Sequence, residues 1–250
     1  MKISFINPVL GGDYSALDIA VTTLSTYLNQ RTVHKAKICD LTFNRKDWQF
    51  FLGRHIKCSR PDIIGISTVA LYMPYVKQLI KEVKSRYGLP VVLGGYHASI
   101  YPKESLNIEG VDFVCVGDGE YVLAGLMDKL ENKLPTTGLA GLGFRDADKA
   151  IINPGGSFIE DIDSLPIADW DAWQDLDKYF YFLGMLYIIG TRGCPYHCSY
   201  CDAVGISQAV KGNYYRLRNP EGYAGEIAFQ WNKYRKRGMR LAQLFDQVFT

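Results

Sequence analysis

Three cysteines in the second half of the chain have a spacing that suits metal chemistry. Cys194, Cys198 and Cys201 follow the pattern C-x3-C-x2-C in the run Gly-Thr-Arg-Gly-Cys-Pro-Tyr-His-Cys-Ser-Tyr-Cys. Thiolate is the usual ligand of an iron–sulfur cluster, and a four-iron cluster normally takes four thiolates. Three close thiolates with no obvious fourth predict a cluster with one iron open to another ligand. The alternatives are a zinc site completed by a residue such as His197, or three unrelated thiols.

This run resembles the cluster motif of radical S-adenosylmethionine enzymes, including the Gly-Cys-Pro start and the aromatic Tyr200 directly before the last cysteine. The resemblance implies that Cys194, Cys198 and Cys201 hold a 4Fe-4S cluster. It also implies that the open iron binds the amino and carboxylate groups of S-adenosylmethionine, with Tyr200 beside that cofactor.

The elements before the cysteines have the pattern of a doubly wound α/β domain, flavodoxin-like or Rossmann-like. Helical spacing is clearest over 74–87, where apolar residues recur at i, i+3, i+4 and i+7 between lysines. Strand candidates such as 62–68 are apolar on both faces, as a parallel sheet covered by helices requires. Five strands are expected, at 2–7, 35–41, 62–68, 90–94 and 111–117, and helices at 14–30, 46–57, 74–87 and 121–132, with a short turn at 102–106.

Ligands of such sheets bind at the carboxyl ends of the strands. Ser67 follows the third predicted strand, and Gly94 and Gly95 follow the fourth. This arrangement resembles the cobalamin-binding domain over residues 1–135. The resemblance implies that the serine and the two glycines line the slot for the nucleotide tail of cobalamin. Together with His97, the loop 117–120 looks like the version of the domain that is fused to radical enzymes.

One motif of that domain is absent. Cobalamin-binding domains that ligate cobalt carry Asp-x-His-x-x-Gly after the first strand, whereas the loop 11–17 contains no histidine. Either cobalamin binds without a protein imidazole below the metal, or the domain is an empty structural sandwich. His97 is a candidate replacement ligand, although a hydrogen bond within its own loop is the simpler role.

The remaining chain is predicted to be a connector, 136–184, followed by the first part of a barrel, 185–250. Within the connector, residues 138–153 are expected to form two short strands around a turn, and the stretch 154–177 is interpreted as a linker with a few apolar anchors. The stretch 162–166 resembles the connector of cobalamin-dependent radical enzymes. A strand, the cysteine loop, a helix and a second strand are then expected, which is the opening of a β/α barrel. In the family that this resembles, the end of the second strand supplies the group that holds the amine of S-adenosylmethionine, and the candidate here is Asp246.

A barrel with two strands cannot close its own core, so we expect the chain to be the front part of a longer enzyme. The strands of this part are expected at 186–190 and 241–245, with the helix at 221–237. Arg216 and Arg218, just before the helix, could reach a carboxylate or a phosphate, and solvated arginines are the first interpretation. The carboxylates of the connector are interpreted as a solvated face rather than a metal site; these are Asp169, Asp171 and Asp175.

The bulk composition excludes several classes of function. The net charge of +2 gives no electrostatic case for nucleic acid or an anionic membrane face. No apolar stretch approaches the roughly 20 residues that span a bilayer. Six cysteines without a secretion signal argue against a disulfide framework and predict a cytoplasmic protein.

The resemblance implies a radical enzyme that reductively cleaves S-adenosylmethionine. A cobalamin-dependent methyltransferase acting on an unactivated carbon of a small molecule is the first interpretation, with an electron donor such as flavodoxin or ferredoxin as partner. Ring formation or rearrangement is the second. A non-catalytic module that binds cobalamin, or zinc through its cysteines, is the third.

Overall fold

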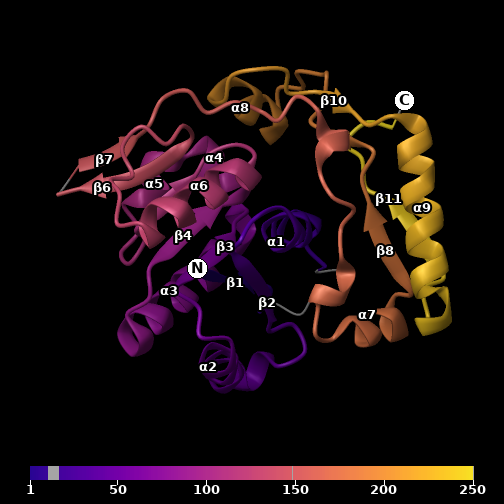
Figure 1. Cartoon of the computed structure of the whole chain (residues 1–250), viewed down its shortest axis with the longest axis horizontal. Helices are drawn as coiled ribbons and strands as arrows, with labels where there is room; N and C mark the ends of the chain where they lie inside the picture. The colour runs from indigo at the N-terminus through magenta and orange to yellow at the C-terminus, as the bar shows by residue number, and fades with distance from the viewer. Residues whose placement is uncertain (11–16, 148, 250) are drawn as a thin grey trace.

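A mixed sheet of seven strands forms the centre of the first half of the chain (Figure 1). The computed structural model describes residues 1–10, 17–147 and 149–249. The strands are β1 (Lys2–Asn7), β2 (Lys35–Asp40), β3 (Ile63–Ser67), β4 (Val91–Gly94), β5 (Phe113–Cys115), β6 (Leu142–Asp146) and β7 (Lys149–Ile152). Their order is β2-β1-β3-β4-β5-β6-β7, and the pairs from β2 to β5 are parallel. The first five strands therefore have the doubly wound order that the sequence predicts.

Helices cover both faces of this sheet and separate two apolar cores. On one face lie α1 (Ile19–Arg31) and α6 (Gly119–Glu131). On the other face lie α2 (Trp48–Ser59), α3 (Met73–Tyr87), α4 (Gly95–Ile100) and α5 (Pro102–Leu106). Successive strand residues point to opposite faces, so Phe5 joins the core under α1 while Ile6 joins the core under α3.

The sheet is two strands larger than the predicted five. The hairpin β6–β7 pairs antiparallel with β5, Cys115 lying opposite Leu142. These two strands were predicted to belong to the connector. They are short, and a local sequence pattern does not indicate which distant strand they pair with. The pairing of the hairpin covers the edge of β5, which would otherwise expose unpaired backbone groups. The boundary predicted at residue 135 thus falls inside the segment that leads into the sheet.

Helix ends follow local rules where the sequence carries them. Pro74 lies in the first turn of α3, and Gly88 ends this helix with φ +62°. Asp18 caps α1, its carboxylate accepting a hydrogen bond from the backbone nitrogen of Val21. The helix predicted over 14–30 therefore starts at Ile19 among the described residues. No described helix is both long and apolar enough to cross a membrane.

The second half contains one β–α–β unit. Its strands β8 (Met185–Ile188) and β11 (Leu241–Leu244) pair in parallel, and α9 (Pro220–Tyr234) connects them. This is the predicted opening of a barrel. Between β8 and α9 lie the short strands β9 (Thr191–Arg192) and β10 (Arg216–Leu217), which pair antiparallel, and the helix α8 (Asp202–Ala209).

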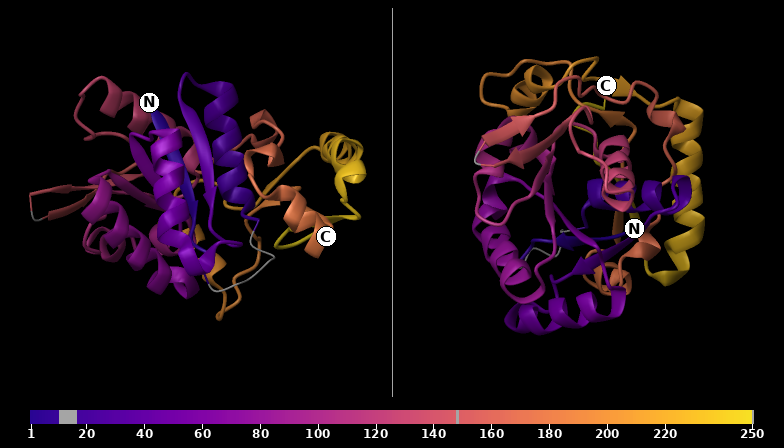
Figure 2. Two further views of the ribbon diagram at one scale, coloured as in Figure 1. Left: turned by 90° about the horizontal axis from the view of Figure 1, so that it is seen from below. Right: turned by 60° about the vertical axis from the view of Figure 1, so that its left-hand side comes forward.

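One apolar core contains residues of both halves and extends along α1. The connector runs between α1 and the β8–β11 pair, and α9 lies on the outer side of that pair (Figures 1 and 2). Trp173 is buried, and its indole nitrogen donates to Thr22 Oγ1 at 2.7 Å. Tyr179, in α7 (Leu176–Phe182), donates its hydroxyl to Asp40 Oδ2 at 2.9 Å. The connector is therefore packed against the sheet domain by large buried side chains.

A half-buried histidine makes stability depend on pH. His55 Nε2 lies 2.9 Å from Ser4 Oγ, and burial, assisted by the charge of Lys37, lowers the pKa of His55 from 6.5 to about 4. A depressed histidine pKa stabilises the fold above pH 6.5, and this stability is lost as the pH falls from 6.5 towards 4. We expect the free energy of unfolding in urea to drop by about 2 kcal/mol more between pH 7.5 and 5 in the parent protein than in His55→Gln. The exposed His197→Gln is the control and should keep the parent slope.

Candidate functional site

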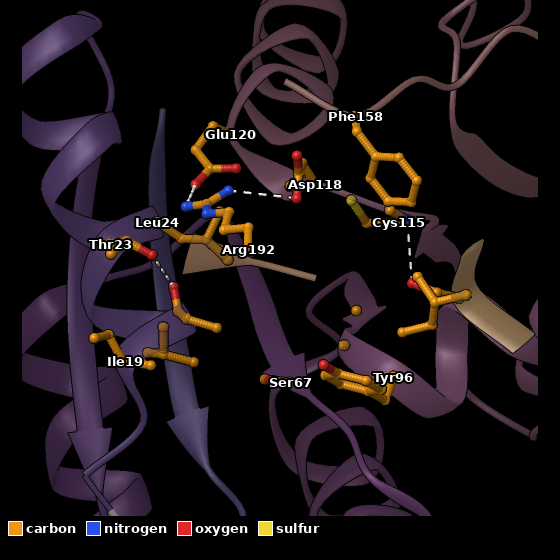
Figure 3. Close-up of a pocket in the computed structure, with 18 of the residues that line it drawn as sticks. Ile19, Thr23, Leu24, Ser67, Tyr96, Cys115, Asp118, Glu120, Phe158 and Arg192 are labelled. Carbon is orange, nitrogen blue, oxygen red and sulfur yellow. Dashed lines mark hydrogen bonds and ion pairs between the residues drawn. The ribbon is translucent and has the colours of Figure 1, made fainter. Parts of the chain in front are cut away.

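A cavity of about 320 Å3 lies at the carboxyl edge of the parallel strands, between the sheet, α1 and the start of the second half (Figure 3). The predicted slot residues Ser67, Gly94 and Gly95 lie together in its wall. Much of the lining is apolar, and it comes from both halves of the chain. Further lining residues include Ile19, Leu24, Cys115, Leu123, Phe158, Ile206 and Phe245.

Gly95 allows the ends of β3 and β4 to approach closely. Its φ is +87°, and a Cβ there would lie 2.8 Å from the backbone nitrogen and oxygen of Thr68 and 3.0 Å from Ser67 Oγ. Thr68 N donates to Gly94 O at 2.8 Å, and His97 N donates to Thr68 O at 3.1 Å. The ends of β3 and β4 therefore lie in close contact beside the cavity, while cofactor binding by Ser67, Gly94 and Gly95 stays a prediction.

His97 does not belong to this pocket lining. Its backbone nitrogen donates to Thr68 O after β3, and its carbonyl oxygen accepts from Tyr101 N. Its ring lies 5.5 Å from that of Tyr101, and its Nδ1 is buried without a partner among the described residues. Most of the histidine-free loop, residues 11–16, lies outside the described residues.

An ionic network forms another wall of the pocket, as Figure 3 shows for three of its members. Arg192 Nη2 donates to Glu120 Oε1 at 2.6 Å, and its Nη1 lies 3.3 Å from Asp118 Oδ1. Arg216 bonds the other oxygen of Asp118 and the carbonyl oxygen of Ile159. Two arginines of the second half thus meet two carboxylates at the start of α6, those of its N-cap Asp118 and of Glu120 in its first turn.

The network is largely buried, so each of its charges depends on its partners. The side chain of Glu120 is only 2% exposed, and that of Arg216 is 4% exposed. Burial alone would lower the pKa of Arg192, but the charges and hydrogen bonds of Glu120 and Asp118 outweigh it and raise the pKa. Removing one partner of such a buried pair typically costs about 3–5 kcal/mol, because the other charge is left uncompensated.

The interpretation of Arg216 and Arg218 as solvated arginines is wrong. Arg216 lies in the network and 4.8 Å from the ring centre of Phe158, while Arg218 pairs with Glu226 and Asp163. Asp118 and Asp163 are distant from these arginines in the sequence, so no local pattern indicates them, whereas Glu226 follows Arg218 by only eight positions, in α9. The carboxylates of the connector are partly exposed and pair with Lys233, Arg237 or Lys178.

The predicted cluster cysteines lie in the loop between β9 and α8. Cys194 is half-buried, Cys198 and Cys201 are exposed, and every residue from 195 to 202 is exposed. Cys201 is the N-cap of α8, where the helix dipole favours negative charge. All three are free thiols, chemically competent to ligate a cluster.

The loop is not arranged as a zinc knuckle. Tetrahedral zinc with bonds of about 2.3 Å requires sulfurs roughly 3.8 Å apart. Among the described residues, the ligand atoms that gather within 4.8 Å in a group of three belong to His34, Asp128 and Glu131, not to the cysteines. A four-iron cluster takes each thiolate on a different iron, which suits sulfurs that stand farther apart.

The other two predicted cofactor residues lie near the same loop. Tyr200 is exposed, and a hydrogen bond to Cys198 raises its pKa. Asp246 Oδ1 accepts hydrogen bonds from Gly190 N, Thr191 N and Thr191 Oγ1 at 2.7–2.9 Å, and Oδ2 accepts one from Tyr223. Asp246 therefore holds the backbone just before the cysteines, and its contact with an amine stays a prediction.

Sequence reasoning missed the residues that join the two halves. Arg192 stands two positions before the first cysteine and was passed over within the motif. Tyr96, next to the glycines, accepts a hydrogen bond from Gln247, and Tyr214 donates to Gln247 Oε1 at 3.5 Å. Burial raises the pKa of Tyr96, so it stays a neutral phenol. No local pattern signals these contacts.

Comparisons with known proteins show which family and which relatives the chain resembles. Residues 9–127 match the family described as the B12 binding domain. An uncharacterized methyltransferase of Pyrococcus horikoshii is 28% identical over 100% of this chain and 55% of its own length. The anaerobic magnesium-protoporphyrin IX monomethyl ester cyclase of Synechocystis is 29% identical over 76% of this chain and 37% of its own length. The chain thus spans about half, or less, of the curated relatives it matches.

A solved structure shares the fold. The radical S-adenosylmethionine methyltransferase TsrM of Kitasatospora setae, with tryptophan substrate and a S-adenosylmethionine analogue bound, superposes with a TM-score of 0.80. The match covers 98% of this chain and 47% of TsrM, at 21% identity. The B12 binding domain stands in front of the C-x3-C-x2-C loop, and the chain resembles the named methyltransferase and cyclase in sequence and TsrM in fold.

Proposed function

We propose that this chain is the cofactor-binding part of a cobalamin-dependent radical S-adenosylmethionine methyltransferase. The observation that carries the proposal is the continuity of the two sites. Arg192 lines the sheet-edge pocket, and Cys194 follows two residues later. When bound, cobalamin would carry the methyl group, and a reduced 4Fe-4S cluster would supply the electron that cleaves S-adenosylmethionine.

The pocket fits one part of cobalamin. A cavity of about 320 Å3 has room for a nucleotide-sized group but not for the whole cofactor with its corrin ring. Ser67, Gly94 and Gly95 lie in its wall, where glycine backbone would let a flat ring approach the strand ends closely. The apolar lining, including Leu24 and Phe158, would keep water from that ring.

The cluster would be held by Cys194, Cys198 and Cys201. Exposure of the last two leaves room for a bulky inorganic group and a further ligand beside it. Asp246 would keep this loop in place through its bonds to Gly190 and Thr191. A reductant such as flavodoxin or ferredoxin, a small-molecule substrate and a cytoplasmic location complete the proposal.

Ring formation is a second candidate, which the Synechocystis cyclase supports. The two reactions differ in what becomes of S-adenosylmethionine. Methyl transfer through cobalamin consumes the methyl group and yields S-adenosylhomocysteine in addition to 5′-deoxyadenosine. Ring formation yields 5′-deoxyadenosine with no methyl transfer.

Anaerobic reconstitution of the chain with iron, sulfide and hydroxocobalamin tests the proposal. We expect about four irons and one cobalamin per chain, with absorption near 400 nm from the cluster. Under dithionite, S-adenosylmethionine labelled in its methyl group should lose the label to cobalamin. A protein that holds one zinc and no sulfide would support the non-catalytic module instead. A chain with a cluster but no retained cobalamin would contradict the methyltransferase assignment.

A further inference from the structure

Arg192 belongs to two sites at once. Its guanidinium forms part of the wall of the sheet-edge pocket, and its backbone leads directly into the cluster loop. The residue between it and Cys194 is Gly193, which has φ +85° and packs so closely that a Cβ would collide with the carbonyl oxygen of Tyr214. Arg192 and the first cysteine are therefore joined by a single residue whose backbone is packed tightly against Tyr214.

The anchor of Arg192 comes entirely from the sheet domain. Glu120 begins the first turn of α6, and Asp118 precedes this helix. In the β9–β10 ribbon Arg192 lies directly opposite Arg216, and like charges in this position are unfavourable unless they are compensated. The two carboxylates provide that compensation, so the ribbon at the base of the cluster loop depends on the loop that bounds the pocket.

The cluster loop itself has little to hold it. Residues 195–202 are all exposed, so few buried contacts offset the entropy of ordering this segment. A cluster bound by three thiolates would order the loop and its ribbon. A ligand packed against Arg192 and Glu120 in the pocket would order the same ribbon from the other side.

We propose that Arg192 is a positioning residue through which the cobalamin pocket and the cluster loop stabilise each other. Each cofactor then binds more tightly when the other is present, because the first to bind has already ordered the shared ribbon. The coupling rests on the proposed function, since it needs both cofactors. It goes beyond that function because it makes the affinity for cobalamin and the affinity for the cluster depend on one another.

The test measures the affinity for hydroxocobalamin by anaerobic equilibrium dialysis, before and after reconstitution of the chain with iron and sulfide. We expect the dissociation constant to fall at least about fivefold on cluster loading in the parent protein. In Arg192→Gln the ratio of the two constants should fall to about one. Glu120→Gln, which keeps the shape of the side chain, should do the same, and the double variant should add nothing further.

Arg218→Gln is the matched control. Arg218 also forms a partly buried ion pair next to β10, with Glu226, but it does not line the main pocket. It should keep the parent ratio. Arg192→Lys should retain only part of the ratio, because one ammonium group cannot reach both carboxylates in the fork geometry of arginine.

The outcomes separate this inference from its premise. If the parent protein binds neither cluster nor cobalamin, the proposed function fails. If it binds both with a ratio of one, or if Arg192→Gln and Glu120→Gln weaken cobalamin equally in both forms, the coupling is overturned and the proposed function stands. Circular dichroism of each variant shows whether it is folded when the ratio of the two dissociation constants is measured. Glu120→Gln is the milder change if Arg192→Gln fails to fold.

Discussion

Cys198→Ala is expected to lower the iron content of the reconstituted chain from about four atoms to less than one. Cleavage of S-adenosylmethionine should fall to background. The reason is that three thiolates already leave one iron without a protein ligand, so the loss of another leaves half of the cluster unheld. Cys194→Ala and Cys201→Ala should behave alike. Iron and sulfide analysis, with absorption near 400 nm, measures the effect.

Cys58→Ala provides the control for this experiment. Cys58 is exposed like Cys198, but it lies in α2 and outside the motif. It should therefore keep about four irons and the parent rate of cleavage. Equal loss in Cys58→Ala would mean that iron is held nonspecifically by exposed thiols. Retention of four irons in Cys198→Ala would remove this residue from the ligand set.

Elements with a strong local pattern could be predicted from the sequence. The helix expected over 74–87 begins one residue earlier, at Met73, and ends at Tyr87, because its apolar spacing, its proline and the following glycine agree. The helix expected over 102–106 has the predicted bounds. The hairpin β6–β7 was recognised as two strands, but its place at the edge of the sheet was not, because pairing with β5 is a contact between distant segments.

The connector shows a similar limit. It was interpreted as a linker with a few apolar anchors, yet Trp170 and Trp173 are buried in the core that covers α1. The sequence around these tryptophans is rich in Asp and Pro, which is typical of an exposed linker. Their burial depends on contacts with distant parts of the chain, which the local sequence does not indicate. The short helix α4 was also missed, because it starts at Gly95 and its six residues carry no periodic signal.

Some residues of the candidate site could likewise be predicted from the sequence, and others could not. Ser67, Gly94 and Gly95 could be placed together because parallel strands end at one edge of a sheet. Arg192 and Glu120 are 72 positions apart in the chain, and each alone is an ordinary charged residue. A charge pattern predicts a partner only within a helix or between known neighbours, so the ionic wall of the pocket was beyond the sequence.

The two adjacent glycines of the slot should respond differently to alanine. Gly95→Ala is expected to lower the free energy of unfolding by about 2–5 kcal/mol, because a side chain is disfavoured at φ +87° and its Cβ would press on Thr68 at 2.8 Å. Gly94 has extended backbone with φ −139°, and the nearest atom to a Cβ there is Cys115 Cβ at 3.8 Å. Gly94→Ala should therefore change stability by less than about 1 kcal/mol.

Gly94→Ala should affect the binding of cobalamin although it leaves stability nearly unchanged. Gly94 lines the cavity, so its new methyl group would occupy space that the cobalamin tail needs between the strand ends. We expect Gly94→Ala to stay folded in urea titrations but to bind hydroxocobalamin at least tenfold more weakly than the parent. Unchanged affinity in Gly94→Ala would place the tail elsewhere. Parent-like stability in Gly95→Ala would show that the loop can relax, and that close approach of β3 and β4 does not require glycine at this position.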